Sequence, residues 1–134
     1  MKKLMFIFLC LLVTSSIAEL NIRKIIQIES NGNPKAYNRK SGAIGLMQIT
    51  PVCLKEYNNY NRTNYKMLDM FNAKINIKVG SWYINKRIPQ MLKYYKCRVN
   101  TRNILISYNA GISYVVNRKK LPIETINYIK KYRR

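Results

Sequence analysis

The sequence has 134 residues, of which 25 are Lys or Arg, five are Asp or Glu and none is His, so the formal net charge is +20 at pH 7. Because the sequence has no histidine, the expected acid or base near neutral pH is a carboxyl group whose pKa is raised by apolar surroundings. The strong positive charge favours an anionic partner, and nucleic acid, anionic lipid and anionic cell-wall polymer all satisfy that condition.

The first 18 residues have the pattern of an export signal. The second and third residues are lysines, residues 4–13 are an unbroken apolar run, and small residues precede a cleavage site before Glu19. The run is shorter than the roughly 20 residues of a membrane span. We therefore expect a signal peptide over 1–18 and export to the periplasm or cell wall, with an uncleaved N-terminal anchor as the alternative. Residues 19–134 then suffice for one compact domain and are too few for two.

The mature sequence shows helical periodicity and almost no strand-like alternation. Residues 20–30 carry apolar side chains at helical spacing. That helix is expected to end at residues 31–34, because Gly32 favours a left-handed cap and Pro34 discourages continuation. The other segments predicted in this half are a loop over 36–42, a short helix over 46–49, another over 52–57 and a polar loop over 58–66.

Residues 67–87 predict one long helix, because apolar residues recur at intervals of about 3.6 residues. Gly80 within this segment costs helix stability and so indicates close packing at that position. The whole pattern predicts an all-α domain of about six or seven short helices. The other helices predicted in this half cover 89–95, 104–110 with Thr101 as its cap, 112–117 and 122–132, with Gly111 separating the second from the third.

Two cysteines, Cys53 and Cys97, lie in the mature domain. In an oxidising compartment they could pair, and two separate buried thiols are the alternative that the sequence leaves open. The sequence has no cluster of His, Cys or carboxylate residues at metal-ligand spacing, and no Gly-rich phosphate loop follows a strand. We therefore expect neither a metal nor a cofactor.

Three separated blocks carry the residues best suited to chemistry. They are Glu29-Ser30 with Asn33-Pro34, then Gly42-Ala43-Ile44-Gly45-Leu46-Met47-Gln48-Ile49-Thr50-Pro51, and then Ser107-Tyr108-Asn109-Ala110-Gly111. Together they resemble the lysozyme-like catalytic domain of the soluble lytic transglycosylases, in the goose-type lysozyme superfamily. The resemblance continues at residues 76–83 and 123–129. It therefore covers about residues 21–132, nearly the whole mature domain.

The resemblance implies a lysozyme-like fold and cleavage of peptidoglycan glycan strands without water. Glu29 would protonate the oxygen that joins N-acetylmuramic acid to N-acetylglucosamine. Its carboxylate would then take the proton of the muramic C6 hydroxyl as that oxygen attacks C1. One carboxyl group suffices for this cycle, and the three blocks hold no second one.

The resemblance also implies which residues surround Glu29. Ser30 would orient the carboxylate or the muramic N-acetyl group, with a serine bonded to the helix backbone as the alternative. Gln48 would hydrogen-bond an acetamido group, and Tyr108 would reach the catalytic carboxyl. Met47 would belong to the core or line the cleft. Asn109 would support the turn before Gly111, and Tyr128 would lie near the active site. Glu124 would lie toward the peptide stem or provide a favourable charge in the first turn of the last helix.

Two other functions remain open. A hydrolytic muramidase of the same fold would use water and a second carboxylate, Glu56 or Asp69, across the cleft from Glu29. A non-catalytic basic protein that binds the cell wall or a membrane would keep only the fold.

The expected partner is the peptidoglycan glycan strand. The small size resembles enzymes that open the wall for secretion, conjugation or pilus assemblies, which is an analogy at the level of fold. Membrane contact is expected only through the signal peptide. A nucleic-acid role is not expected, because export removes that partner and no reading motif is present.

Overall fold

The computed structural model describes residues 19–134, so the signal peptide expected at 1–18 lies outside the described residues. The described part is mostly helical, which confirms the all-α prediction. Within it, every helix is too short or too polar to cross a bilayer. The elements are α1 (Ile22–Ser30), β1 (Tyr37–Asn38), β2 (Ala43–Ile44), α2 (Pro51–Asn61), the 3-10 helix η1 (Met67–Phe71), α3 (Ala73–Trp82), the π turn η2 (Tyr83–Arg87), α4 (Ile88–Tyr94), α5 (Thr101–Ala110), α6 (Ser113–Val116) and α7 (Ile123–Arg133).

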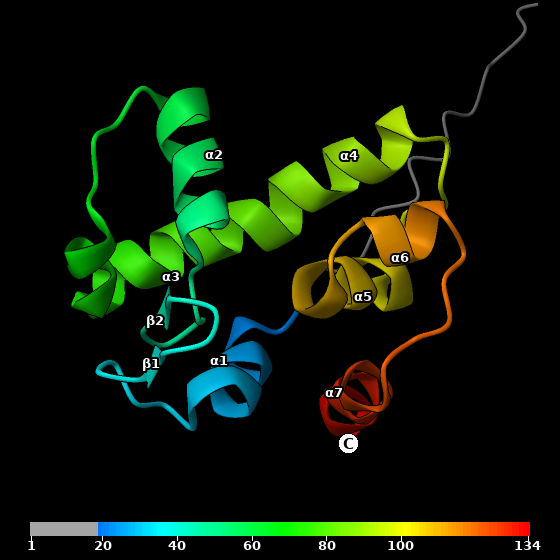
Figure 1. Cartoon of the computed structure of the whole chain (residues 1–134), viewed down its shortest axis with the longest axis horizontal. Helices are drawn as coiled ribbons and strands as arrows, with labels where there is room; N and C mark the ends of the chain where they lie inside the picture. Colours follow the sequence, from blue (N-terminus) through cyan, green and yellow to red (C-terminus); the bar gives the residue numbers. More distant parts are fainter. Residues whose placement is uncertain (1–18) are drawn as a thin grey trace, which may run out of the picture.

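Helices α3 and α4 are joined through η2 into one rod that crosses the molecule (Figure 1). Pro89 accounts for the π turn at its middle. Proline has no N–H, and its ring clashes with the carbonyl four residues earlier, so regular α-helical bonding cannot pass through it. The amide of Ile88 instead donates to the carbonyl of Tyr83, five residues earlier. The predicted break at Pro89 is therefore wrong, because the helix continues through a π turn.

The predicted single helix over 67–87 is also wrong at its start. Residues 67–71 form the separate helix η1, and α3 begins afresh after Asn72. The side chain of Asn72 accepts hydrogen bonds from the amides of Lys74 and Ile75, which caps α3. This cap overrides the apolar periodicity that runs across the boundary.

The helix predicted over 46–49 is not present. Residues 45–48 form a turn, and Ile49 pairs with Ile44 in an isolated antiparallel bridge. The helix predicted over 52–57 is longer than expected. It is α2, which Thr50 caps by accepting from the amide of Cys53 and which runs to Asn61.

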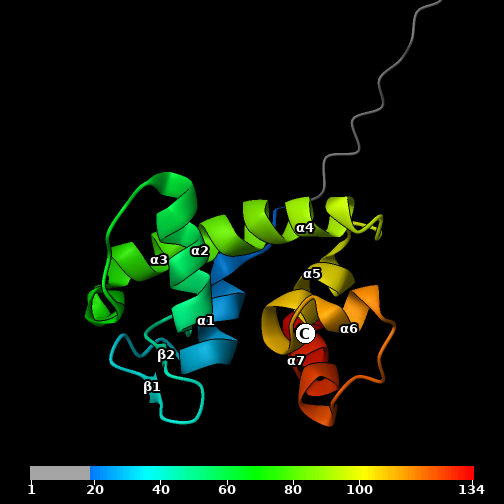
Figure 2. The same ribbon diagram turned by 45° about the horizontal axis from the view of Figure 1, so that its top comes forward.

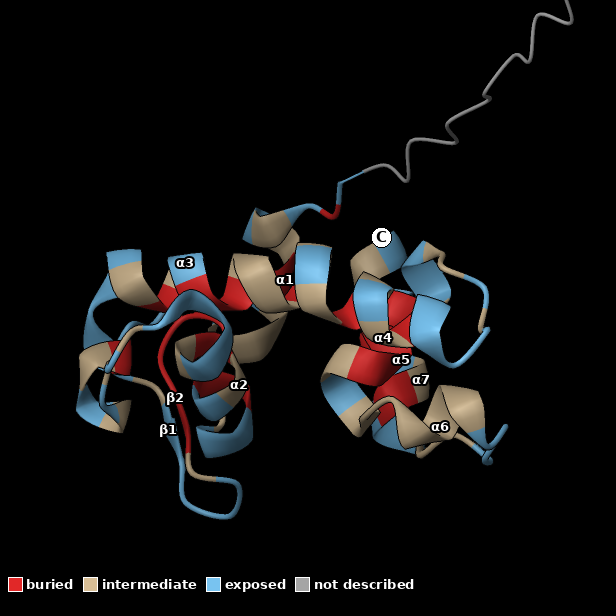
Figure 3. Ribbon diagram, turned by 90° about the horizontal axis from the view of Figure 1, so that it is seen from above, coloured by how far each residue is buried: buried red, intermediate tan, exposed pale blue. Residues whose placement is uncertain are grey.

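The strands β1 and β2 form a small antiparallel pair that the sequence pattern did not predict. Tyr37 pairs with Ile44, and Asn38 pairs with Ala43. Two residues a strand are too few for an alternation of apolar and polar side chains. Figure 3 shows β2 buried and β1 exposed, so the pair lies at the edge of the core.

The rod joins two groups of elements. Helices α1 and α2 and the strand pair form one group, and α5, α6 and α7 form the other (Figures 1 and 2). Helix α1 also packs against α7, so it contacts both groups. The largest completely buried side chains come from both groups and from the rod: Ile25, Met47, Ile49, Met70, Val79, Ile84, Ile88, Leu92, Ile104 and Leu105.

The close packing expected at Gly80 is confirmed. A Cβ atom at Gly80 would lie 2.5 Å from Sδ of Met47 and 2.8 Å from its Cε. The missing side chain lets the segment that carries Met47 lie directly on α3. The rod thereby positions the second sequence block.

Candidate active site

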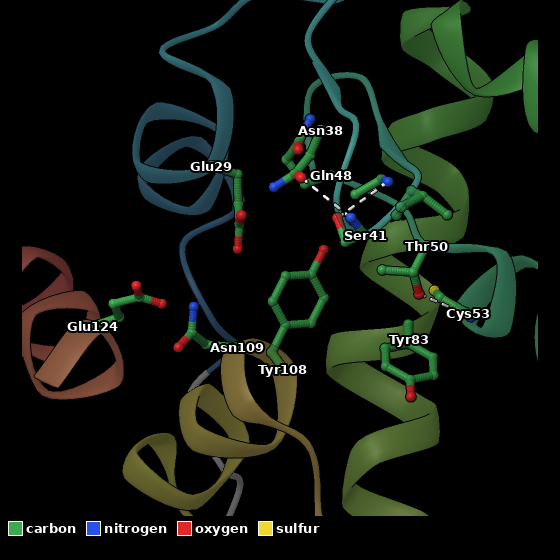
Figure 4. Close-up of a pocket in the computed structure, with 12 residues that line it drawn as sticks. Glu29, Asn38, Ser41, Gln48, Thr50, Cys53, Tyr83, Tyr108, Asn109 and Glu124 are labelled. Atoms are coloured by element: carbon green, nitrogen blue, oxygen red, sulfur yellow. Dashed lines mark hydrogen bonds between the residues drawn. The ribbon is translucent and has the colours of Figure 1, made fainter. Parts of the chain in front are cut away.

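A cavity of about 340 Å³ lies between the two groups of elements and contains residues from all three sequence blocks. Figure 4 shows Glu29 from α1, Tyr108 and Asn109 from α5 and Glu124 from α7 around it. Of the eight residues named from the sequence, Ser30, Met47 and Tyr128 do not line this space. The lining residues are Glu29, Asn38, Ser41, Ala43, Gln48, Ile49, Thr50, Cys53, Tyr83, Tyr108, Asn109 and Glu124.

Glu29 occupies the last turn of α1 and is half-buried. Burial raises the pKa of this carboxyl from 4.5 to about 7, and a hydrogen bond from Tyr128 opposes the rise. The Tyr128 hydroxyl donates to Oε1 of Glu29 at 2.8 Å. With a pKa near 7, protonated and ionised forms are both well populated at neutral pH. Glu29 can therefore donate a proton and accept one in the same cycle.

The tyrosine hydroxyl that reaches Glu29 belongs to Tyr128, whereas the sequence resemblance assigned that contact to Tyr108. Tyr108 instead donates to the carbonyl of Met47 at 2.7 Å. Burial raises the pKa of the Tyr108 hydroxyl well above its usual range, and the nearby Glu29 adds to the effect. Tyr108 therefore stays neutral, and it holds α5 against the loop that precedes α2.

Ser30 hydrogen-bonds to backbone, which was one of its two expected roles. Its hydroxyl donates to the carbonyl of Ile26 at 3.2 Å, in its own helix, and to the carbonyl of Leu46 at 2.8 Å. The second contact ties the end of α1 to the Gly45–Ile49 segment. Met47, for which core and cleft were both expected, has no exposed surface and belongs to the core.

Asn76 hydrogen-bonds to the backbone of the segment around Gly45–Ile49. It was not among the site residues predicted from the sequence. It is completely buried in α3. Its Oδ1 accepts from the amide of Met47, and its Nδ2 donates to the carbonyls of Ile44 and Met70, each at 2.8 Å. An asparagine inside an apolar helical face was the available signal, because a buried amide must find partners.

The Asn76 side chain fits where it does because Gly45 has no side chain. A Cβ atom at Gly45 would collide with the Asn76 amide and the carbonyl of Met70, and the backbone there has a φ of +79°. Gln48, three residues later, also has a left-handed backbone, with a φ of 49°. This unusual conformation turns Gln48 toward the cavity. Its Nε2 donates to the carbonyl of Gly45 at 3.1 Å, which leaves the amide oxygen for a ligand.

Asn109 and Glu124 line the cavity from the group of α5–α7. The Oδ1 of Asn109 accepts from the Thr125 hydroxyl at 2.7 Å, so this pair fixes α5 against α7. Glu124 is exposed in the first turn of α7. In Figure 4 it projects toward the cavity from the side opposite Gln48, so each of its two expected roles fits its position.

The carboxylates named for a hydrolytic mechanism lie elsewhere. Glu56 pairs with the guanidinium of Arg87, and Asp69 accepts from the amide of Lys66 at the start of η1. Neither lines the cavity. Among the described residues, no three His, Cys, Asp or Glu side chains gather closely enough to hold a metal ion.

Tyr83 and Cys53 line the cavity and were not predicted to do so. Tyr83 is the first residue of the π turn, and its ring centre lies 6.3 Å from that of Tyr108. Pro89 six residues later was the available signal, since π turns are frequent at functional sites. Cys53 and Cys97 are both free thiols, so the pairing left open by the sequence is absent.

Comparisons with known proteins place this chain beside lytic transglycosylases. The family model described as the transglycosylase SLT domain matches residues 12–127. Two relatives are named membrane-bound lytic murein transglycosylase E. The one from Buchnera aphidicola subsp. Acyrthosiphon pisum (strain APS) is 31% identical over 112 residues, which cover 81% of this chain and 50% of the relative. The one from subsp. Baizongia pistaciae (strain Bp) is 35% identical over 117 residues, which cover 81% and 55%. No solved structure matches this chain significantly.

Proposed function

Because the chain belongs to the transglycosylase SLT domain family, we propose that it is a peptidoglycan lytic transglycosylase in which Glu29 acts as acid and then as base. The observation that carries this proposal is the position of Glu29. It is a half-buried carboxyl on a cavity wall, with a pKa raised to about 7. The chain spans about half the length of the two relatives, so activity and substrate are proposals for this chain.

In the first step, protonated Glu29 transfers its proton to the oxygen that links N-acetylmuramic acid to N-acetylglucosamine. The bond from that oxygen to muramic C1 breaks, and positive charge develops at C1. The leaving sugar keeps the proton as a new hydroxyl group. Gln48 lies across the cavity from Glu124, where its amide oxygen can accept from an acetamido N–H of the glycan.

In the second step, the C6 hydroxyl of the muramic residue attacks C1, and the Glu29 carboxylate takes its proton. The product is a 1,6-anhydromuramic end, and Glu29 is protonated again. Tyr128 serves the ionised state, because its hydroxyl donates to the carboxylate oxygen. A buried carboxylate without such a donor would be much harder to form.

We propose export to the periplasm or cell wall, where the substrate lies, on the signal pattern of residues 1–18. The high positive charge favours approach to an anionic polymer. Service to a secretion or conjugation assembly remains a prediction from the resemblance alone.

The test is mass spectrometry of the muropeptides released from purified sacculi. The unmodified chain is expected to release anhydromuramic ends. Glu29→Gln keeps the shape of the side chain and removes its proton exchange, so release should fall by about a thousandfold or more. Glu56→Gln is the matched control, because that carboxylate lies outside the cavity, and it should cleave normally. Full cleavage by Glu29→Gln would overturn the proposal.

Hydrolysis is the second candidate, and the position of Glu124 favours it more than that of Glu56 or Asp69. Glu124 is the other carboxylate of the cavity lining. A hydrolase would place water between two carboxyl groups and would leave reducing ends. Reducing ends that disappear in Glu124→Gln would establish hydrolysis. Anhydromuramic ends that persist in that variant would exclude it.

A further inference from the structure

A second cavity, of about 510 Å³, is lined by residues of α5 and α6 and of the segments that follow α4 and α6. Arg102 and Ile106 of α5 line it, whereas Tyr108 and Asn109 of the same helix line the first cavity. None of the carboxylates among residues 19–134 lies in its lining. Its cationic residues are Lys96, Arg98, Arg102, Arg118 and Lys119.

These five cations have no anionic partner among the described residues, where the ion pair present joins Arg87 and Glu56. Gathering like charges in one concave space costs free energy, because each raises the positive potential on the others. Lys119 is nevertheless held in place, since its Nζ lies 3.4 Å from the Ser113 hydroxyl and 5.4 Å from the ring centre of Tyr114. A multiply charged anion would offset this repulsion.

Two helix ends in this cavity share one unusual feature. Lys96 follows α4 and Arg118 follows α6, and both have left-handed backbones, with φ values of 56° and 49°. At each end the left-handed residue donates to the carbonyl three residues earlier, and the next residue donates to the carbonyl five residues earlier. Glycine is the usual residue at this position. A basic residue stands in its place at both ends, as Arg62 does at the end of α2, and at these two ends it adds a cation to the lining of the cavity.

We propose that this cavity is a non-catalytic site for a phosphate-bearing ligand. The three arginines offer planar forks of N–H donors that fit phosphate oxygens, and the two lysines add point charges. A single carboxylate would leave most of these charges unneutralised. The cavity exceeds one phosphate group in size, and Tyr95 and Tyr114 are among its lining residues. The ligand is therefore a pyrophosphate or a phosphate attached to a larger group.

Calorimetric titration with inorganic pyrophosphate at low salt tests the site on the whole mature domain. The cavity variant is Lys96→Gly with Arg118→Gly. The matched control is Lys55→Gln with Arg62→Gly, since Arg62 ends α2 with a left-handed φ of 53° outside this cavity. Both variants lose two charges. Both should keep the melting temperature or raise it, because glycine suits the left-handed positions.

The cavity variant should bind pyrophosphate at least about tenfold more weakly, while the control stays within about twofold of the unmodified domain. An equal loss in both variants would show a response to net charge alone and would overturn the proposal. Absence of pyrophosphate binding by the unmodified domain would also overturn it. Lytic activity is not part of the readout, so failure here leaves the role of Glu29 untouched.

Vesicles identify the source of the phosphate. Vesicles of phosphatidylcholine with phosphatidylglycerol carry anionic phosphodiesters, and pure phosphatidylcholine vesicles have no net charge. Loss of binding to the anionic vesicles in the cavity variant, but not in the control, would assign a lipid headgroup. Equal vesicle binding by both variants, with pyrophosphate binding lost in the cavity variant, would assign a soluble phosphate compound.

Discussion

Tyr128 donates a hydrogen bond of 2.8 Å to Glu29, although 99 positions separate the two residues in the sequence. The contact crosses the interface between α1 and α7, which pack against each other. It acts on the pKa of Glu29 in the direction opposite to burial. The balance between the two effects leaves the carboxyl near neutrality, where one group can serve as both acid and base.

Tyr128→Phe should move the pH profile of cleavage. Removing the donor raises the pKa of Glu29, because the ionised form loses a stabilising hydrogen bond. The alkaline limb of kcat/KM, which reports loss of the acid form, should shift upward by about half a unit to one unit. Tyr114→Phe, at the second cavity, is the control. If the alkaline limb of kcat/KM does not shift in Tyr128→Phe, the Tyr128 hydroxyl does not affect the pKa of Glu29.

Glu29→Gln should change the pH dependence of stability. The folded pKa of about 7 exceeds the ordinary value of 4.5, so the folded state disfavours the ionised form. The stability contributed by protonated Glu29 is complete below about pH 4.5 and is lost as pH rises through 7. The variant should therefore equal the unmodified domain at pH 4 and exceed it by about 2 kcal/mol at pH 8, after allowance for solvent screening.

Urea unfolding at the two pH values measures this difference. Asp69→Asn provides a comparison, since Asp69 lies outside the cavity and caps η1. An equal gain for Glu29→Gln at pH 4 and pH 8 would contradict the raised pKa.

Asn76→Ala should loosen the cavity wall formed by the second sequence block. The change leaves the buried amide of Met47 without its acceptor and removes the donor to the carbonyls of Ile44 and Met70, of which the Ile44 carbonyl still accepts from the amide of Ile49. A cost of about 3 kcal/mol or more in unfolding free energy is expected. Hydrogen exchange of the Met47 amide should accelerate, and cleavage should fall with it. Asn59→Ala, on the exposed face of α2, should change neither quantity.

Gly80→Ala should destabilise the domain despite a better helix propensity. Alanine gains up to about 1 kcal/mol as a helix former, but its Cβ would lie 2.5 Å from Sδ of Met47. Overpacking of this kind costs about 1–3 kcal/mol, so strain should outweigh propensity. In a double-mutant cycle with Met47→Ala, the two changes should couple by about 1 kcal/mol or more. Strictly additive effects would mean that the contact carries no strain.

The sequence predicted the helical class and brought together residues that the structure places around one cavity. Glu29, Gln48 and Tyr108 belong to different blocks, and the family resemblance supplied their proximity. The resemblance did not identify which tyrosine donates a hydrogen bond to Glu29. Both tyrosines lie on helices beside the cavity, and only the packing of α7 against α1 selects Tyr128.

The errors in the fold have local causes. The apolar periodicity runs across Asn72 without a break, so a side-chain cap decided the boundary there. The strand pair is too short to leave a pattern. The second cavity combines the ends of α4 and α6 with one face of α5, and basic residues dispersed along the sequence give no sign of that convergence.

The π turn has a consequence for how this chain tolerates insertions and deletions. Each residue of an α-helix turns the chain by about 100°, so deletion of one residue from α3 would rotate α4 against the core by that angle. Ile88 and Leu92, now buried, would then leave the core. The π turn holds one residue more than an α-helical turn, so deletion of one residue within 83–87 would keep α4 on its present face. A one-residue gap at the turn is therefore a milder change than the same gap elsewhere in the rod.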